Sequence, residues 1–124
     1  MLNKLATEIH ENAKSKGFFD SEKNIGEMLC LIHSEVSEAL EADRINKYSN
    51  GCLKNKEFSE KSPSNVKWNA YFVDNVKNTF EDELADVVIR VLDLCAFKKI
   101  DIESHIKAKM RYNSSRPHKH GKSY

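Results

Sequence analysis

Two pairs of carboxylate residues lie in segments of the sequence that are otherwise strongly apolar. Glu35 and Glu38 belong to LIHSEVSEALEA, and Glu83 and Asp86 belong to FEDELADVVIRVLDL. The members of each pair are three residues apart, so they share one face if the segments are helical. Oxygen ligands that repel one another suit a hard divalent cation, so the pattern indicates a Mg²⁺ site, with Mn²⁺ as the alternative ion.

The four acids lack the cationic neighbours that other acids in this chain have. Three of them have no Lys or Arg three or four residues away, and Asp86 has only Arg90. Elsewhere such pairs are present, as with Lys23 and Glu27 or Glu103 and Lys107. The alternative is that these acids are solvated or pair with basic residues from elsewhere in the fold. A single pair would favour that alternative, but two pairs on two apolar helices favour the metal site.

Hydrophobic periodicity predicts that helices position these acids. We expect an all-α fold, a four-to-five-helix bundle in one domain spanning residues 1–124. The second and third helices carry the acids, and we expect them to be antiparallel neighbours. The predicted helices run from about Leu2 to Lys16, from Glu22 to Asn46, from Thr79 through at least Cys95, and from Ile102, with Asp101 as its cap, to Tyr112.

The two acid-bearing helices have identifiable ends and apolar stripes. Asp20 or Ser21 can cap the second helix. Asn78 with Glu81, or Thr79 with Asp82, forms a capping-box pattern at the start of the third. The third helix is apolar on several sides, so we expect it to be buried nearly all round. The apolar stripe of the second helix consists of Ile25, Leu29, Ile32, Val36 and Leu40.

A long connection, about residues 47–78, separates these two helices. It contains Asn50-Gly51 and Ser62-Pro63-Ser64, which are turn signals. The stretch VKWNAYFV at 66–73 alternates weakly and is interpreted as a short strand or hairpin arm. Its aromatic residues form either a lid over the core, which we favour, or a surface for stacking a base; they are Trp68, Tyr71 and Phe72.

Composition limits the class of protein. The chain has 124 residues and a formal net charge of +1, so bulk charge does not require a nucleic-acid partner. No apolar run approaches the length of a membrane span, and we expect no membrane partner. Cys30, Cys52 and Cys95 form no CxxC motif, and Cys30 and Cys95 are interpreted as small core residues. A reduced, cytoplasmic protein is therefore expected.

The C-terminal segment KAKMRYNSSRPHKHGK carries basic charges and no acid. Lys109, Asn113 and Arg116 share a face if the last helix continues through them. Lys and Arg could hold phosphate oxygens, and Asn could bond a sugar or a base edge. The alternative is a frayed basic terminus, about residues 113–124, ended as a helix by Pro117.

The acid set contains only oxygen ligands. The chain has no ExxH, and His33 is expected on a different face from Glu35, where it has a structural role. Mg²⁺ held by few carboxylates completes its shell with substrate phosphates, so phosphoryl or nucleotidyl hydrolysis fits the site.

The segments EVSEALEA, ELADVVIRVLDL and KAKMRYNSSRPHKHGK together resemble the all-α NTP pyrophosphohydrolases, the MazG-like group. The resemblance covers most of the chain outside the connection. It implies Mg²⁺-dependent cleavage of a nucleoside triphosphate to the monophosphate and pyrophosphate by a homodimer or homotetramer. It also implies metal ligation by Glu35, Glu38, Glu83 and Asp86, and nucleotide contacts from Lys109, Asn113 and Arg116.

Two features depart from that group. Ser34 stands where an acid often precedes the first Glu, so Glu41 or Asp93 could take over a role. The connection is also longer, and no motif identifies the preferred base or sugar. We expect an enzyme that sanitises the nucleotide pool, with Glu38 ordering or deprotonating the attacking water. The alternative is a non-enzymatic helical module that dimerises and binds nucleic acid or an acidic partner through its basic tail.

Overall fold

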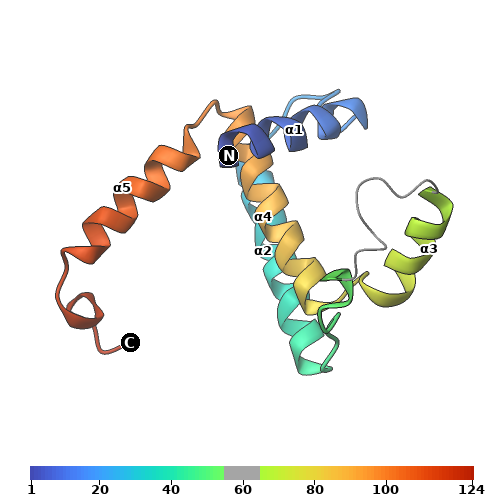
Figure 1. Cartoon of the computed structure of the whole chain (residues 1–124). Coiled ribbons are helices and arrows are strands. Elements are labelled where there is room, and N and C mark those ends of the chain that lie inside the picture. The colour runs from blue at the N-terminus through green and yellow to red at the C-terminus, as the bar shows by residue number, and fades with distance from the viewer. Residues whose placement is uncertain (55–64) are drawn as a thin grey trace. The chain divides into compact units, whose positions relative to one another are not determined.

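The computed structural model describes residues 1–54 and 65–124, and every regular element in these ranges is helical (Figure 1). The all-α prediction is therefore confirmed. No helix in these ranges is long and apolar enough to cross a membrane. In chain order the elements are α1 (Leu2–Ser15), α2 (Ile25–Arg44), the 3₁₀ turn η1 (Cys52–Lys54), α3 (Asn65–Asn75), α4 (Phe80–Phe97), α5 (Ile102–Ser114) and the 3₁₀ turn η3 (His118–Gly121).

The chain divides into two compact units, each described here by itself. The first, the terminal unit, comprises Met1–Glu22 and Val91–Tyr124. The second, the central unit, comprises Lys23–Arg90 and contains all four predicted metal ligands. Helix α4 begins in the central unit and ends in the terminal unit.

The central unit is built on α2 and the first part of α4, which run antiparallel. Glu35 pairs with Arg90, and Glu38 interacts with Glu83, so residue numbers rise on one helix as they fall on the other. Ala39 is buried in this unit with little side-chain volume. Small residues at a contact allow two helices to approach closely, which brings the acids of both helices together.

The face of α2 that is buried differs from the predicted stripe. Glu35, Ala39 and Ala42 are buried, at spacings of four and three residues. Val36 and Leu40, from the predicted stripe, are about half exposed. The prediction ranked faces by side-chain hydrophobicity, whereas α2 is buried along its row of small residues and Glu35.

Helix α2 begins three residues later than predicted, because Asn24 caps it. The Asn24 side chain accepts a hydrogen bond from the Glu27 backbone N–H at 3.1 Å. Asp20 instead belongs to the turn after α1, where its N–H donates to the Gly17 carbonyl. Gly17 has φ +85°, the left-handed conformation typical of the residue that ends a helix.

The end of α2 is bonded to the start of α4. The Lys47 N–H donates to the Ala42 carbonyl at 2.8 Å, and the Phe80 N–H donates to the Lys47 carbonyl at 2.9 Å. The Tyr48 ring packs on the Phe80 ring, and the Ser49 N–H donates to Glu81. The loop that follows α2 is therefore held against the first turn of α4.

The capping prediction for α4 is confirmed for the Thr79 side chain, but the reciprocal bond to Asp82 comes from the Asn78 N–H and not from the Thr79 N–H. Thr79 accepts a hydrogen bond from the Asp82 N–H, and Asp82 accepts one from the Asn78 N–H. Burial of α4 on nearly all sides is wrong: Val88 is 52 % exposed, and Leu84 and Ile89 are also exposed. Part of the apolar surface of α4 is therefore left uncovered by the residues that the structure describes.

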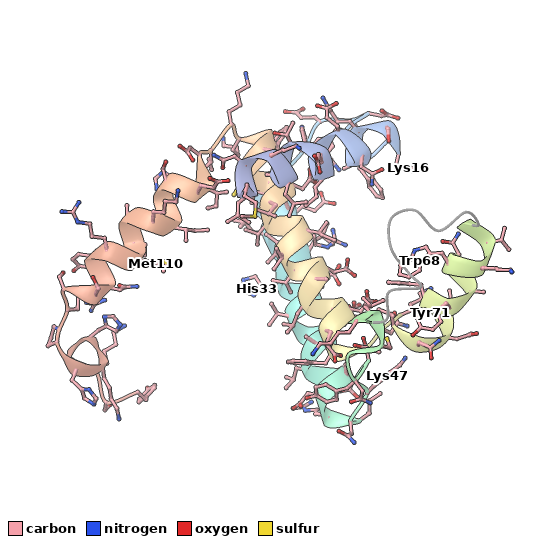
Figure 2. The ribbon with its side chains drawn as sticks, in the orientation of Figure 1. Lys16, His33, Lys47, Trp68, Tyr71 and Met110 are labelled. Atoms are coloured by element: carbon pink, nitrogen blue, oxygen red, sulfur yellow. The ribbon has the colours of Figure 1, made fainter. Side chains whose placement is uncertain are left out.

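The interpretation of 66–73 as a strand is wrong, because this stretch belongs to α3. Trp68, Tyr71 and Phe72 are spaced i, i+3 and i+4, which is a helical period, and the Trp68 ring packs against both others. Trp68 and Tyr71 lie on α3 and Lys47 follows α2 (Figure 2). The Tyr71 hydroxyl also bonds the Cys52 carbonyl. These half-buried aromatic residues contact one another, while Ser62-Pro63-Ser64 lies outside the described residues.

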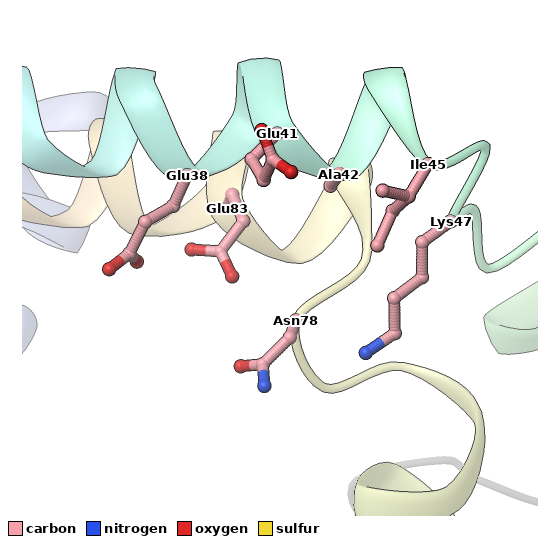
Figure 3. Close-up of a pocket in the computed structure, with 7 residues that line it drawn as sticks. All are labelled: Glu38, Glu41, Ala42, Ile45, Lys47, Asn78 and Glu83. Atoms are coloured by element: carbon pink, nitrogen blue, oxygen red, sulfur yellow. The ribbon is translucent and has the colours of Figure 1, made fainter.

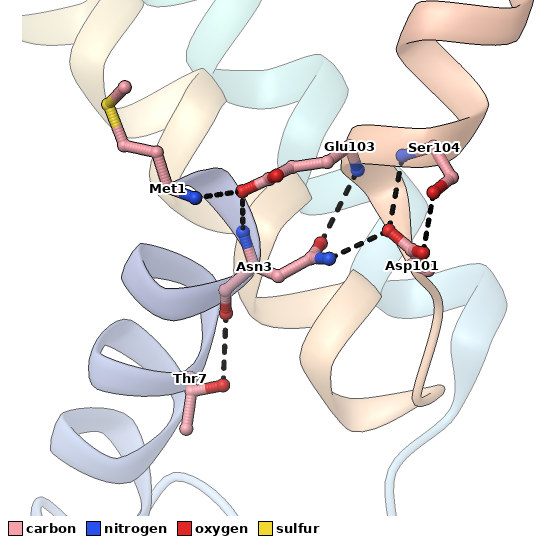
Figure 4. Close-up of polar contacts among 6 residues, drawn as sticks. All are labelled: Met1, Asn3, Thr7, Asp101, Glu103 and Ser104. Carbon is pink, nitrogen blue, oxygen red and sulfur yellow. Dashed lines mark hydrogen bonds and ion pairs between the residues drawn. The ribbon is translucent and has the colours of Figure 1, made fainter.

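In the terminal unit, α1 and α5 are joined at their first turns. The Asn3 side chain donates to Asp101 at 2.7 Å and its backbone N–H donates to Glu103 at 2.9 Å (Figure 4). Asp101 also caps α5, as predicted, by accepting from the Ser104 N–H. These hydrogen bonds, first that from Asn3, lower the pKa of Asp101 to about 2. Cys95 is buried here as predicted, but Cys30, in the central unit, is exposed.

Candidate functional site

Three of the four predicted metal ligands converge in the central unit. Glu35 and Glu38 project from α2 and Glu83 from α4, and each offers an oxygen within 4.8 Å of the others'. Glu35 is 7 % exposed and Glu83 5 % exposed, whereas Glu38 is exposed. We call these three residues the carboxylate cluster. Two of its members are thus out of solvent and one faces it.

Glu35 has a cationic partner, contrary to the prediction. The Arg90 Nε donates to Glu35 Oε1 at 2.5 Å. Sequence spacing identifies ion-pair partners on the same helix only, so it paired Arg90 with Asp86 and not with Glu35. The antiparallel packing of α2 on α4 supplies the partner across the helices. A carboxylate has two oxygens with free lone pairs, so Glu35 keeps acceptor capacity for a metal ion.

Glu83 has no such partner among the described residues. Burial, then its hydrogen bond with Glu38, and then the Glu38 charge raise the pKa of Glu83 to about 7. A proton is therefore held between two carboxylates near neutral pH unless a cation takes its place. This pair of facing carboxylates, with Glu83 buried and Glu38 exposed, is the feature of the cluster that fits a divalent metal.

Asp86 is half-buried beside the cluster and is not one of its three members. Burial raises the pKa of Asp86, and the charges of Asp82 and Glu35 add to the effect, while Arg90 opposes it. The fourth predicted ligand therefore contributes to the negative field of the cluster. The structure groups three of the four predicted ligands closely and places the fourth next to them.

A cavity of about 350 Å³ opens beside the cluster. Glu41, one of the two acids considered as replacements for the missing acid at Ser34, lines it. Asp93, the other, lies in the terminal unit and bonds His10 at 2.8 Å. Ser34 bonds the Leu31 carbonyl of its own helix. The cavity is lined by Glu38, Glu41, Ala42, Ile45, Lys47, Asn78 and Glu83 (Figure 3).

Sequence reasoning missed Lys47 and Asn78. Lys47 stands at the start of the long connection, and Asn78 was considered only as a cap of the third helix. Their place beside Glu83 depends on how the loop after α2 meets α4. The sequence carries a weak signal for them, which is an Asn at positions 46 and 78. In the structure both residues adopt positive φ, of 55° and 59°. Asn is among the few residues that tolerate this conformation, so it marks chain reversals.

The predicted nucleotide contacts Lys109, Asn113 and Arg116 belong to the terminal unit. Helix α5 ends at Ser114, so Arg116 does not continue its face as predicted; its guanidinium bonds the His120 carbonyl. Lys109 and Arg116 nevertheless both lie over the Tyr112 ring, at 5.2 and 5.5 Å from its centre. Among the described residues, the Asn113 side-chain oxygen is buried without a hydrogen-bond donor. Tyr112 was not predicted to take part.

The ligand set of the cluster is chemically uniform. Three carboxylates, two of them buried, supply only hard oxygen donors, and His33 is exposed and outside the group. Such a set suits Mg²⁺ or Mn²⁺ better than zinc or a soft metal.

Comparison of the chain with protein-family models, curated proteins and solved structures finds no match.

Proposed function

We propose that this chain hydrolyses a nucleoside triphosphate to the monophosphate and pyrophosphate with Mg²⁺, or Mn²⁺ in its place, at the carboxylate cluster. The observation that carries the proposal is the approach of Glu35, Glu38 and Glu83 to within 4.8 Å across two helices. Buried like charges are costly unless a cation compensates them. The MazG-like resemblance of the motifs supports the same reaction.

The three residues of the carboxylate cluster have different roles, which follow from how deeply each is buried. Bound Mg²⁺ would supply an activated water and neutralise charge on the phosphates. Glu35, fixed by Arg90, and Glu83 are the buried ligands, and Asp86 adds negative charge beside them. Glu38 is exposed, so it can both ligate and order or deprotonate the attacking water.

We propose that the basic residues of the terminal unit contact the nucleotide. Lys109 and Arg116 present cations that the Tyr112 ring orients. The buried Asn113 oxygen has no donor within the described chain, so a ligand N–H or O–H would satisfy it. A nucleoside triphosphate offers both phosphate oxygens and such donors.

We further propose a cytoplasmic homodimer or homotetramer. The three cysteines are free, which fits a reducing compartment. Large exposed apolar surface marks interfaces in proteins. On the two acid-bearing helices the exposed apolar residues include Leu29, Val36, Leu40, Leu84, Val88 and Ile89.

A non-enzymatic interaction module is the second candidate. The same exposed apolar residues and the cations over Tyr112 favour it, because a module that dimerises and binds a polyanion needs both. It does not account for buried carboxylates grouped without enough cations. The cluster therefore favours the enzyme.

A panel of nucleoside triphosphates, incubated with Mg²⁺ or EDTA, distinguishes the candidates. The enzyme releases pyrophosphate and a monophosphate only with the metal. Diphosphate and orthophosphate as products would refute the cleavage position. The absence of any metal-dependent product across the panel would favour the interaction module.

A further inference from the structure

The cavity beside the cluster has two chemically different ends. One end is acidic, with Glu38 and Glu83. The other presents Lys47 and Asn78, which lie on the loop after α2 and at the start of α4. Figure 3 shows the Lys47 amine and the Glu83 carboxylate facing the space in which the Asn78 amide also lies. Lys47 is the only cationic side chain among the described residues that line this space.

The backbone of Lys47 is fixed although its side chain is exposed. Its N–H donates to the Ala42 carbonyl at 2.8 Å and its carbonyl accepts from the Phe80 N–H at 2.9 Å. The preceding residue, Asn46, has a φ of 55°, the left-handed conformation that reverses the chain after α2. Within the described ranges the Lys47 amine forms no ion pair, whereas the neighbouring Glu41 pairs with Arg44 at 3.9 Å. The amine is thus positioned and available.

Asn78 is fixed in a similar way. It adopts a φ of 59°, and its N–H donates to Asp82 at 2.9 Å. Both constraints act on its backbone, so its side-chain amide remains directed at the cavity with its donors unused. A positioned ammonium and a neighbouring amide provide donors on one side of the cavity, opposite the carboxylates.

The charges of the side chains that line the cavity favour a ligand that carries both a divalent cation and phosphate groups. Three glutamates line the cavity, so a free polyanion is repelled unless a divalent cation at the cluster compensates them. A metal-bound triphosphate extends beyond the metal and leaves phosphate oxygens that need donors. Lysine is a common point-charge contact for phosphate.

We infer that Lys47, assisted by the Asn78 amide, binds the terminal phosphates of the metal-bound triphosphate, at a position from which pyrophosphate departs. This rests on the proposed function, and adds a phosphate contact within the central unit to those proposed on the terminal unit. Lys47 stabilises the negative charge that develops on the leaving pyrophosphate, so it contributes to turnover as well as to affinity.

The test is calorimetric titration of inorganic tripolyphosphate into the full chain with Mg²⁺. Lys47→Gln keeps the size of the side chain and removes its charge, and Asn78→Gly keeps the positive φ and removes the amide. Lys77→Gln is the matched control, because Lys77 is exposed and directly precedes Asn78 in the sequence but does not line the cavity. We expect Lys47→Gln to weaken binding about tenfold or more, from the loss of one charged hydrogen bond. Asn78→Gly should weaken it less, and Lys77→Gln should not weaken it.

Two further measurements separate this inference from the proposed function. Mg²⁺ alone should raise the melting temperature of Lys47→Gln as much as that of the wild type, because Lys47 is not a ligand. Equal tripolyphosphate affinity in Lys47→Gln and wild type, or no binding by the wild type with Mg²⁺, would overturn the inference. Lys47-dependent binding without pyrophosphate release from any nucleotide would support the phosphate contact at Lys47, and would refute both the hydrolysis and the role of Lys47 in turnover.

Discussion

Arg90 on α4 donates to Glu35 on α2 at 2.5 Å, and this pair distinguishes Glu35 from the other two members of the carboxylate cluster. Glu35 is buried and compensated, whereas Glu83 is buried and meets another carboxylate instead of a cation. The cluster therefore contains one permanently balanced charge and one that a proton or a metal ion must balance. The two positions should respond differently to substitution.

Replacing Arg90 with Gln should destabilise the metal-free protein. It leaves Glu35 buried without its partner, at a cost of about 1–3 kcal/mol in the free energy of unfolding. Because Mg²⁺ compensates the same charge, the loss should shrink when Mg²⁺ is added. Urea unfolding in EDTA and in excess Mg²⁺ measures both quantities. Arg111→Gln, at an exposed position on α5, is the control, and an equal loss with and without Mg²⁺ would disprove the coupling.

Local signals in the sequence were sufficient to predict the helices that carry the site. Asp101 and the Thr79–Asp82 pair act as caps, as their spacing predicted, because a cap depends only on residues within one turn. The i, i+3 spacing likewise places Glu35 and Glu38 together. These predictions hold because helical geometry fixes the relation between near neighbours.

The predictions that failed concern contacts between residues on different helices. The buried face of α2 follows small residues such as Ala39 rather than the largest apolar ones, and only the packing partner decides this. Arg90 could be assigned to Glu35 only once the antiparallel pairing was known. Lys47 and Asn78 are brought to the cavity by the bond between the Phe80 N–H and the Lys47 carbonyl, which no local pattern predicts.

The stability of the metal-free protein should depend on pH through Glu83. Its pKa rises from the ordinary 4.5 to about 7 on folding, so its protonated form is favoured in the folded state. This contribution is complete below pH 4.5 and is lost as pH rises through about 7. The free energy of unfolding of the wild type, relative to Glu83→Gln, should therefore fall between pH 5 and about 7.5 in EDTA. A difference that stays constant over this range would contradict the assignment.

Val88 tests the proposed assembly. It is 52 % exposed on α4, one turn from exposed Leu84, and we expect it to lie in an interface between copies. Val88→Glu should convert the oligomer to monomer, because a buried unpaired charge opposes association. Light scattering at micromolar concentration measures the mass. Val66→Glu makes the same change on α3, where Val66 is 79 % exposed, and should leave the mass unchanged. A monomeric wild type would refute the interface.

Neutralising Glu38 or Glu83 should separate a metal site from a structural ion-pair network. Glu38→Gln and Glu83→Gln remove repulsion within the cluster, so each variant should keep or raise its melting temperature in EDTA. Each should lose most of the stabilisation by Mg²⁺, which follows mass action on the folded state, and turnover should fall by orders of magnitude.

Glu35→Gln supplies the internal contrast to these two variants, because it deprives Arg90 of its partner and should lower the melting temperature in EDTA. Glu8→Gln, at an exposed position on α1, is the control for the loss of one negative charge. The measurement is thermal melting of all five proteins, first in EDTA and then in excess Mg²⁺. A clear drop for Glu83→Gln in EDTA, with its Mg²⁺ increment intact, would mean that Glu83 serves the fold through a cationic partner. The carboxylate cluster would then not be a metal site, and the interaction module would become the favoured function.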